Sequence, residues 1–233
     1  MRVEPITRLV GHIAVPGDKS ISHRAVLLGA LCDGETRVTG FGRSADTEAT
    51  IAAVRALGIT VYEHDEDTLH IFGKGLHGLV APGRPIDCAN AGTLVRLLSG
   101  ILAGQNGQQF ELTGDASLSA RPMQRVTEPL ARMGGGVETE DGHLPIGIEG
   151  RPLRSITYEL PVASAQVKSA ILLAGLYADG ETTVVEPTPT RDHTELMLEA
   201  AGVSISRREK SVSIRGVRAS VRFTSAMRPS GDQ

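Results

Sequence analysis

Basic and hydroxyl side chains recur at the starts of three Ala- and Leu-rich segments. The first segment begins DKSISHRA, so Lys19 and Ser20 precede an apolar run and Arg24 follows one turn later. A helix N-terminus presents unpaired backbone N–H groups and the positive end of the helix dipole, which together attract phosphate or carboxylate. A cation in that first turn is unfavourable unless an anion neutralises it. The pattern predicts a site for a small metabolite that carries phosphate and carboxylate groups.

The second and third segments, NAGTLVRL and SAQVKSA, repeat this arrangement. Their candidate residues are Asn90, Gly92, Thr93, Arg96, Ser164, Gln166 and Lys168. Gly92 has no side chain, which lets an anion approach the backbone closely. As an alternative, Ser20, Asn90 and Ser164 are ordinary helix N-caps and the basic residues are solvated. The recurrence of polar starts in three segments favours the anion site.

Further basic residues lie at the starts of other helical segments. Arg121 precedes Pro122, which suits the first position of a helix. We therefore expect the Arg121 guanidinium at the mouth of that helix, where it could clamp a carboxylate with two hydrogen bonds. An exposed loop arginine is the alternative. Arg125 and Arg191 stand in comparable places, in RPMQRV and TRDHTE.

Several other polar residues are interpreted as structural. Asp192 and Glu195 in DHTE fit a helix cap followed by a capping-box acid. His23 lies in the first anion-binding segment and is expected to be a hydrogen-bonded core or cap histidine. Cys32 and Cys88 are far apart and are expected to be small buried apolar residues.

The three segments belong to a longer internal repeat, because Ser20, Gly92 and Ser164 are equally spaced in the sequence. Each segment is followed by a β-branched stretch, a second amphipathic run that ends near glycine, and two further strand candidates. The sequence therefore predicts an α/β fold of three βαβαββ repeats. We expect the helices to pack inside, the sheets to face outward, and the N-termini of the first helices to converge.

Composition narrows the functional classes. The chain has 233 residues, a formal net charge of −3, 3% aromatic residues and no Trp, which disfavours nucleic-acid binding. No apolar stretch is long enough to span a membrane and no secretory leader is evident, so we expect a cytoplasmic protein without a membrane partner. The histidines lack metal-ligand spacing, and the glycine clusters match no nucleotide fingerprint. Neither a metal nor a cofactor is predicted.

Five ordered strings, PGDKSISHRA, NAGTLVRL, GDASLSARPMQRV, LPVASAQVKSA and TRDHTE, closely resemble the N-terminal half of the bacterial 5-enolpyruvylshikimate-3-phosphate synthase family. The resemblance implies one half of an inverse α/β barrel whose two domains each hold three βαβαββ units. It also implies transfer of a carboxyvinyl group from phosphoenolpyruvate to a hydroxyl of shikimate 3-phosphate, in aromatic amino-acid biosynthesis. The reaction would pass through a tetrahedral intermediate and release phosphate.

The resemblance also implies residue roles. The residues expected to contact shikimate 3-phosphate are Lys19, Ser20, Arg24, Ser164, Ala165, Gln166 and Arg191. Lys19 would in addition reach phosphoenolpyruvate, and it is the residue of this chain expected to be catalytic. Asn90, Gly92 and Arg121 would line the phosphoenolpyruvate pocket, where glyphosate also binds in this family.

The sequence departs from the family pattern because it does not continue into the second domain. We expect residues 1–14 to be a strand and hinge segment that belongs with that domain, residues 15–216 to be the three-repeat substrate-binding domain, and residues 217–233 to be a disordered or aberrant tail. The family's acid and base for proton transfer lie on the second domain, so the isolated chain is expected to be inactive. It should keep weak affinity for shikimate 3-phosphate, and a separate C-terminal half is a candidate partner.

Three alternatives stay open at this point. One is a non-catalytic remnant that only binds shikimate 3-phosphate. Another is a fragment of the enolpyruvyl transferase that acts on a UDP-sugar, which is disfavoured because neither Cys32 nor Cys88 resembles that enzyme's reactive loop cysteine. The third is an RNA phosphate cyclase of related fold, which the net charge disfavours.

Overall fold

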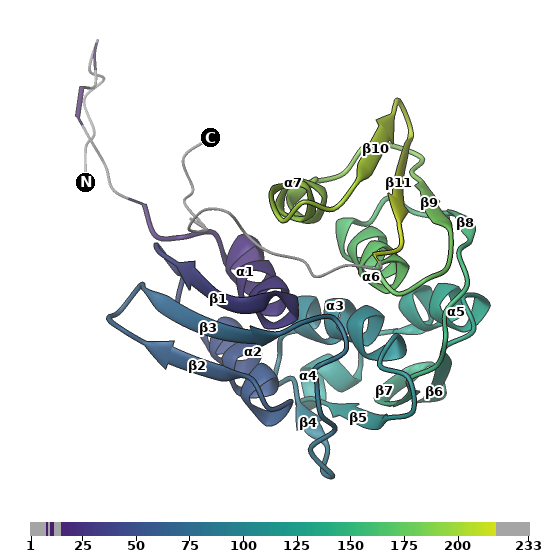
Figure 1. The fold of residues 1–233 in the computed structure, drawn as a ribbon, viewed down its shortest axis with the longest axis horizontal. Helices are drawn as coiled ribbons and strands as arrows, with labels where there is room; N and C mark the ends of the chain where they lie inside the picture. Colours follow the sequence, from purple (N-terminus) through teal and green to yellow (C-terminus); the bar gives the residue numbers. More distant parts are fainter. Residues whose placement is uncertain (1–7, 9, 12–14, 218–233) are drawn as a thin grey trace, which may run out of the picture.

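Three similar α/β units follow one another along the chain in the computed structural model (Figure 1). The structure describes residues 8, 10–11 and 15–217. The expected segment 1–14 and the expected tail 217–233 fall almost entirely outside the described residues. No helix among the residues that the structure describes is long and apolar enough to cross a membrane.

The first unit is α1 (Lys19–Leu31), β1 (Asp33–Val38), α2 (Ala45–Ala56), β2 (Thr60–Glu63) and β3 (Leu69–Lys74). Asp18 caps α1 because its side chain accepts a hydrogen bond from the Ile21 N–H at 2.8 Å. Ser44 and Thr47 form a reciprocal capping box at the start of α2. Gly58 follows α2 with a φ of 85°, a conformation that glycine adopts without strain.

The second unit is β4 (Ile86–Asp87), α3 (Gly92–Ala103), β5 (Gln109–Thr113), α4 (Ala116–Ser119), α5 (Gln124–Arg132), β6 (Gly136–Glu140) and β7 (His143–Glu149). The short helix α4 is an insertion that the repeat pattern did not predict. Because Asp115 caps α4 and α5 begins only at Gln124, the expectation that Pro122 opens a helix is wrong. Arg121 lies instead in the turn between these two helices.

The third unit is β8 (Thr157–Glu159), α6 (Ala165–Gly175), β9 (Glu181–Val185), α7 (His193–Ala200), β10 (Ile205–Arg208) and β11 (Ser211–Arg215). Ser164 caps α6. The starts of α1, α3 and α6 at residues 19, 92 and 165 therefore follow the predicted repeat closely.

Each unit forms its own sheet, and the sheets share one topology. The strand orders are β4-β5-β7-β6 and, given in the matching direction, β8-β9-β11-β10, so corresponding strands occupy corresponding places. The first strand of each of these two sheets pairs in parallel with its neighbour, and the other pairs are antiparallel. Within the described residues the first sheet has the order β1-β3-β2, without the strand that corresponds to β4 and β8.

The helices lie inside and the sheets face outward, as predicted (Figure 1). The core is aliphatic: Leu94, Leu97 and Leu98 of α3 have no solvent-exposed surface. Helix α3 approaches α6 so closely that a Cβ atom on Gly100 would lie 2.2 Å from the Ala170 carbonyl oxygen. Cys32 and Cys88 are buried, as expected.

Replacement of Gly100 by alanine should test this helix contact. The added methyl group would push α3 away from α6, and overpacking of this kind costs about 1–3 kcal/mol. We expect G100A to lower the free energy of unfolding by about that amount in urea titrations. Gly147→Ala is the matched control, because its Cβ would meet only the Glu138 Cβ, at an ordinary 3.9 Å. Equal stability of the two variants would contradict the packing described.

Candidate anion-binding site

The starts of α1, α3, α6 and α7 surround one pocket of about 240 Å³. We call it the three-helix pocket, after the three repeated helices that the sequence predicted to converge. Its lining residues are Ser20, Arg24, Thr93, Ser164, Ala165, Gln166, Arg191 and His193. The lining contains two arginines and no acidic side chain among the residues that the structure describes. An anion at this place would meet both helix dipoles and guanidinium groups.

Arg24 is the most constrained cation of the pocket. Its Nε donates to Thr194 Oγ1 at 2.6 Å, and its Nη2 donates to Ser169 Oγ at 2.9 Å. Nη1 donates to the Ser20 carbonyl oxygen at 2.9 Å. Burial lowers the pKa of Arg24 to about 10, which still leaves the guanidinium charged at neutral pH. Arg24 therefore contributes a fixed positive charge that joins α1 to α6 and α7.

Gln166 connects the second helix start to the third. Its Oε1 accepts from Arg96 Nη1 at 2.8 Å, and its Nε2 donates to Thr93 Oγ1 at 3.0 Å. These two partners fix the orientation of the side-chain amide, because only the oxygen can accept from a guanidinium. Ser164 Oγ accepts the Val167 N–H at 3.4 Å, as an ordinary N-cap does.

A second basic group lies beside the three-helix pocket, at the start of α3. A Cβ atom on Gly92 would lie 2.8 Å from Arg96 Nη1 and 3.0 Å from Arg121 Nη1, so both guanidiniums reach this glycine. Arg121 Nη2 also donates to Asn90 Oδ1. Burial, and then the nearby charges of Arg121 and Arg125, lower the pKa of Arg96. We call Arg96 and Arg121 the arginine pair, a site where like charges gather; the carboxylate beside it is Asp115, which accepts a hydrogen bond from Asn90 Nδ2 at 2.8 Å.

Lys19 does not line the three-helix pocket. Its Nζ forms an ion pair with Asp46 Oδ2 at 2.8 Å, and 55% of its side chain is exposed. Asp46 is therefore an anion within the protein that neutralises Lys19, so the position of this cation does not by itself require a ligand. Asp46 lies in the first turn of α2, where a carboxylate is favoured by the helix dipole. Sequence reasoning could not find this pairing because it depends on the packing of α2 beside α1.

Two further sequence interpretations need correction. The Asp192 side chain makes no capping hydrogen bond, although it precedes α7. Glu195 is fully buried and lies 2.7 Å from Lys168 Nζ, so it is an ion-pair partner and not a capping-box acid. Lys168 is buried in turn, and it does not line the anion pocket. Its position in the first turn of α6 resembled that of the binding cations, but its side chain points to other partners.

His193 is a pocket residue that sequence reasoning missed. It lies at the start of α7, and its Nδ1 is buried without a hydrogen-bond partner among the described residues. Burial and the charges of Arg24 and Arg191 lower its pKa, which favours the neutral ring at pH 7. Its position two residues after Arg191, in TRDHTE, could have indicated that His193 lies at the same pocket.

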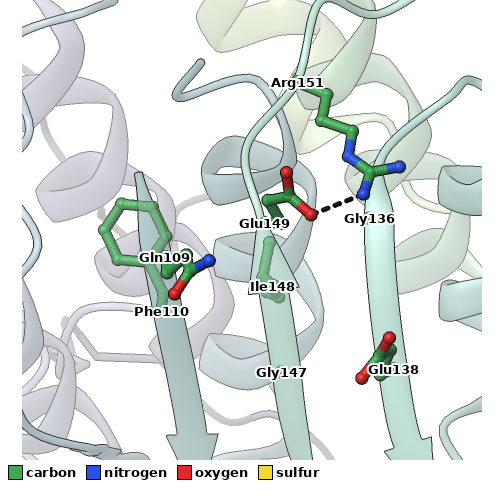
Figure 2. A pocket seen from close by; sticks show the side chains of 8 residues that line it. All are labelled: Gln109, Phe110, Gly136, Glu138, Gly147, Ile148, Glu149 and Arg151. Carbon is green, nitrogen blue, oxygen red and sulfur yellow. Dashed lines mark hydrogen bonds and ion pairs between the residues drawn. The ribbon is translucent and has the colours of Figure 1, made fainter. Parts of the chain in front are cut away.

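A depression of similar size, about 280 Å³, lies on the outer face of the second sheet. Figure 2 shows Arg151 directed toward Glu149, with Glu138 on the neighbouring strand. This surface carries two carboxylates and one guanidinium, and its lining residues come from strands β5, β6 and β7 and the segment after β7. It lacks the helix N-termini that favour anions, so the three-helix pocket is the better candidate. Among the described residues, no His, Cys, Asp or Glu cluster has metal-site geometry.

The fold and site together define a domain of three βαβαββ units that presents helix N-termini and arginines to a small anion. Residues 3–229 match the model of the EPSP synthase family, 3-phosphoshikimate 1-carboxyvinyltransferase. The chain belongs to this family.

Curated relatives and solved structures agree with that assignment. The chain is 55% identical over 214 residues to the 3-phosphoshikimate 1-carboxyvinyltransferase of Acidithiobacillus ferrooxidans, and the match covers 92% of this chain and 49% of the relative. The enzyme of the same name from Methylococcus capsulatus is 55% identical, with 90% and 48% covered. The EPSP synthase structure from Acinetobacter baumannii superposes with a TM-score of 0.87 at 45% identity, covering 94% of this chain and 48% of that one. The chain thus spans about half the length of the relatives it matches.

Acidification should destabilise the helix interface beside this site. The His23 ring is buried between α1 and α2, with Nδ1 2.6 Å from Thr50 Oγ1, and burial lowers its pKa from 6.5 to about 4. Below pH 6.5 the unfolded chain takes up this proton while the folded chain does not. Stability should therefore fall as the pH drops from 6.5 to 4, by about 3 kcal/mol from this group.

Unfolding titrations at several pH values would measure this dependence. We expect His23→Gln to flatten the slope in that window. His143→Gln, at the exposed β6–β7 hairpin, is the control that should keep the wild-type slope. A wild-type slope in the His23 variant would show that other groups govern acid stability.

Proposed function

We propose that this chain provides the shikimate 3-phosphate site and part of the phosphoenolpyruvate site of a carboxyvinyl transferase. The observation that carries the proposal is the three-helix pocket, in which Arg24 and Arg191 meet several helix starts without an acidic neighbour in the lining. Family membership supports the choice of ligands. Because the substrates are small biosynthetic metabolites, we place the protein in the cytoplasm.

The three-helix pocket is suited to the phosphate end of shikimate 3-phosphate. Ser164 and Ala165 stand at the start of α6, where hydroxyl and backbone N–H groups could donate to phosphate oxygens. Gln166 keeps one Nε2 hydrogen for a ligand, because Thr93 accepts the other. Arg191 is exposed at the pocket wall and could approach a phosphate with two parallel hydrogen bonds. Ser20 and Arg24 would complete this subsite.

The arginine pair is suited to the phosphoenolpyruvate anion. The missing side chain of Gly92 lets the Arg96 and Arg121 guanidiniums come close to each other, and Asn90 holds Arg121. An anion here would relieve the repulsion between these guanidiniums. Lys19 could join it by leaving Asp46, since an exposed ion pair contributes only about 0–1 kcal/mol.

Proton transfer is the step of the reaction for which this chain offers few acidic or basic side chains. Carboxyvinyl transfer needs an acid to protonate the enol methylene and a base to accept the hydroxyl proton. The lining of the three-helix pocket contains no carboxylate among the described residues. Lys19 is the candidate catalytic group here, and the remaining groups are proposed to come from a second half. The UDP-sugar alternative is not favoured, because burial raises the pKa of Cys88 to about 12 and leaves the thiol unreactive.

Removal of Arg191 should weaken binding of shikimate 3-phosphate. A hydrogen bond to a charged group contributes about 1.5–3 kcal/mol, which corresponds to a loss of roughly tenfold or more. Calorimetric titration of the wild-type chain, R191A and the control R208A would measure it. Arg208 is exposed on β10, so its removal should leave the affinity unchanged. The proposal fails if the wild-type chain does not bind at millimolar ligand, or if R191A binds as well as R208A.

Turnover should require a second half. We expect the chain alone to release no phosphate from shikimate 3-phosphate and phosphoenolpyruvate. Mixing it with a separately expressed C-terminal half of the Acidithiobacillus ferrooxidans relative should restore release if the two halves associate. Lys19→Met in the mixture should reduce the rate more than the control Lys74→Met on β3. Turnover by the chain alone would refute the assignment of proton transfer to the second half. Binding without turnover in the mixture would favour a non-catalytic binding protein.

A further inference from the structure

A charged cluster is buried next to the three-helix pocket. Lys168 Nζ lies 2.9 Å from Glu186 Oε2 and 2.7 Å from Glu195 Oε1, and these three side chains, the buried triad, are at most 6% exposed. The triad joins α6, the segment that follows β9, and α7. The pocket itself is not lined by these residues, so ligand contact does not explain them.

The triad holds the residue that precedes Arg191. Lys168 Nζ donates to the Thr190 carbonyl oxygen at 3.5 Å, and the Thr190 hydroxyl donates to Glu186 Oε1. The Glu186 N–H in turn donates to the Lys210 carbonyl oxygen at 2.8 Å, which ties this segment to the β10–β11 hairpin. The carbonyl and the hydroxyl of Thr190 are therefore both anchored to the triad. The peptide group that joins Thr190 to Arg191 is therefore held in place.

The triad also adjoins the partners of Arg24. Ser169 follows Lys168, Thr194 precedes Glu195, and their hydroxyl oxygens lie 2.7 Å apart. Each hydroxyl accepts a hydrogen bond from the Arg24 guanidinium. The nearby Glu195 carboxylate favours the charged form of Arg24. Ser169 and Thr194, which adjoin the triad in the sequence, thus hold Arg24, while Thr190, which the triad contacts, directly precedes Arg191.

Stability alone is a weak reason for such a cluster. Desolvation of buried ions offsets most of their attraction, and apolar replacements are often as stable. A better-attested use of buried charges is to select one arrangement of the surrounding elements. The formal charges of Lys168 and Arg24 balance those of Glu186 and Glu195, so the cluster can stay buried while it fixes geometry.

We propose that Lys168, held between Glu186 and Glu195, is a positioning residue that places Arg191 and Arg24 at the three-helix pocket and so sets the affinity for a phosphate group. The identity of the phosphorylated ligand rests on the function proposed above. The proposed ordering of residues 186–195 by the triad does not depend on which ligand binds.

Two variants test this positioning role. Thr190→Val removes the hydroxyl bond to Glu186 without changing charge, and Thr183→Val, which removes a comparable bond to Ser213, is the control. The double variant K168M/E186Q removes one positive and one negative charge and leaves Glu195 to balance Arg24, so it should fold with near wild-type stability. Measurements are calorimetric affinity for shikimate 3-phosphate, urea unfolding, and ¹⁵N relaxation of the Arg191 amide and the Arg24 Nε–H group.

We expect T190V and the double variant K168M/E186Q to bind shikimate 3-phosphate about tenfold more weakly, the loss of about one charge-assisted hydrogen bond. The Arg191 amide should become more mobile in both variants, and T183V should match the wild type. Wild-type affinity in a folded double variant, or an unchanged Arg191 amide in T190V, would overturn the proposal. If the wild type does not bind the ligand, the proposed function fails, while the relaxation data still decide whether the triad orders this segment.

Discussion

The close contact between α3 and α6 governs the rest of this structure. Gly100 lets the two helices approach until backbone meets backbone, and the fully buried leucines of α3 fill the space around that contact. Helices packed this closely bring their N-termini to one end of the molecule. Each sheet then covers the outside of its own unit (Figure 1). The anion pocket is therefore a consequence of how the repeats share one helical core.

The converging helix N-termini bring several positive charges close together. The cationic side chains are stabilised there in different ways. Lys19 pairs with Asp46, and Arg24 is fixed by hydroxyl and carbonyl oxygens. Arg96 has a lowered pKa because it is buried beside other guanidiniums. Arg24 and Arg191 meet at the three-helix pocket, whose lining holds no carboxylate among the described residues, and Arg96 and Arg121 meet at the start of α3. A doubly anionic ligand would complete the charge balance there.

Much of the fold could be predicted because hydrophobic periodicity and capping residues act locally. The equal spacing of Ser20, Gly92 and Ser164 located three helix starts, and glycines after the second helices indicated where those helices end. The prediction went wrong around Arg121, where Asp115 caps the extra helix α4. It also went wrong at Glu195, where the local capping-box pattern competes with a buried lysine. A capping pattern in the sequence does not show whether a side chain binds the adjacent helix N-terminus or a residue that is distant in the sequence.

The sequence by itself determined the repeat, the class of fold, and the kinds of side chain at each helix start, because these depend on spacing and residue type. Only the tertiary structure decided which cations share a pocket. Arg24 and Arg191 are far apart in the sequence and meet because α1, α6 and α7 pack together. Lys19 and Lys168 have similar local signals, but each is paired with a carboxylate brought by another element. Electrostatic interactions depend on the distance between charges in space, which the number of residues between them in the sequence does not give.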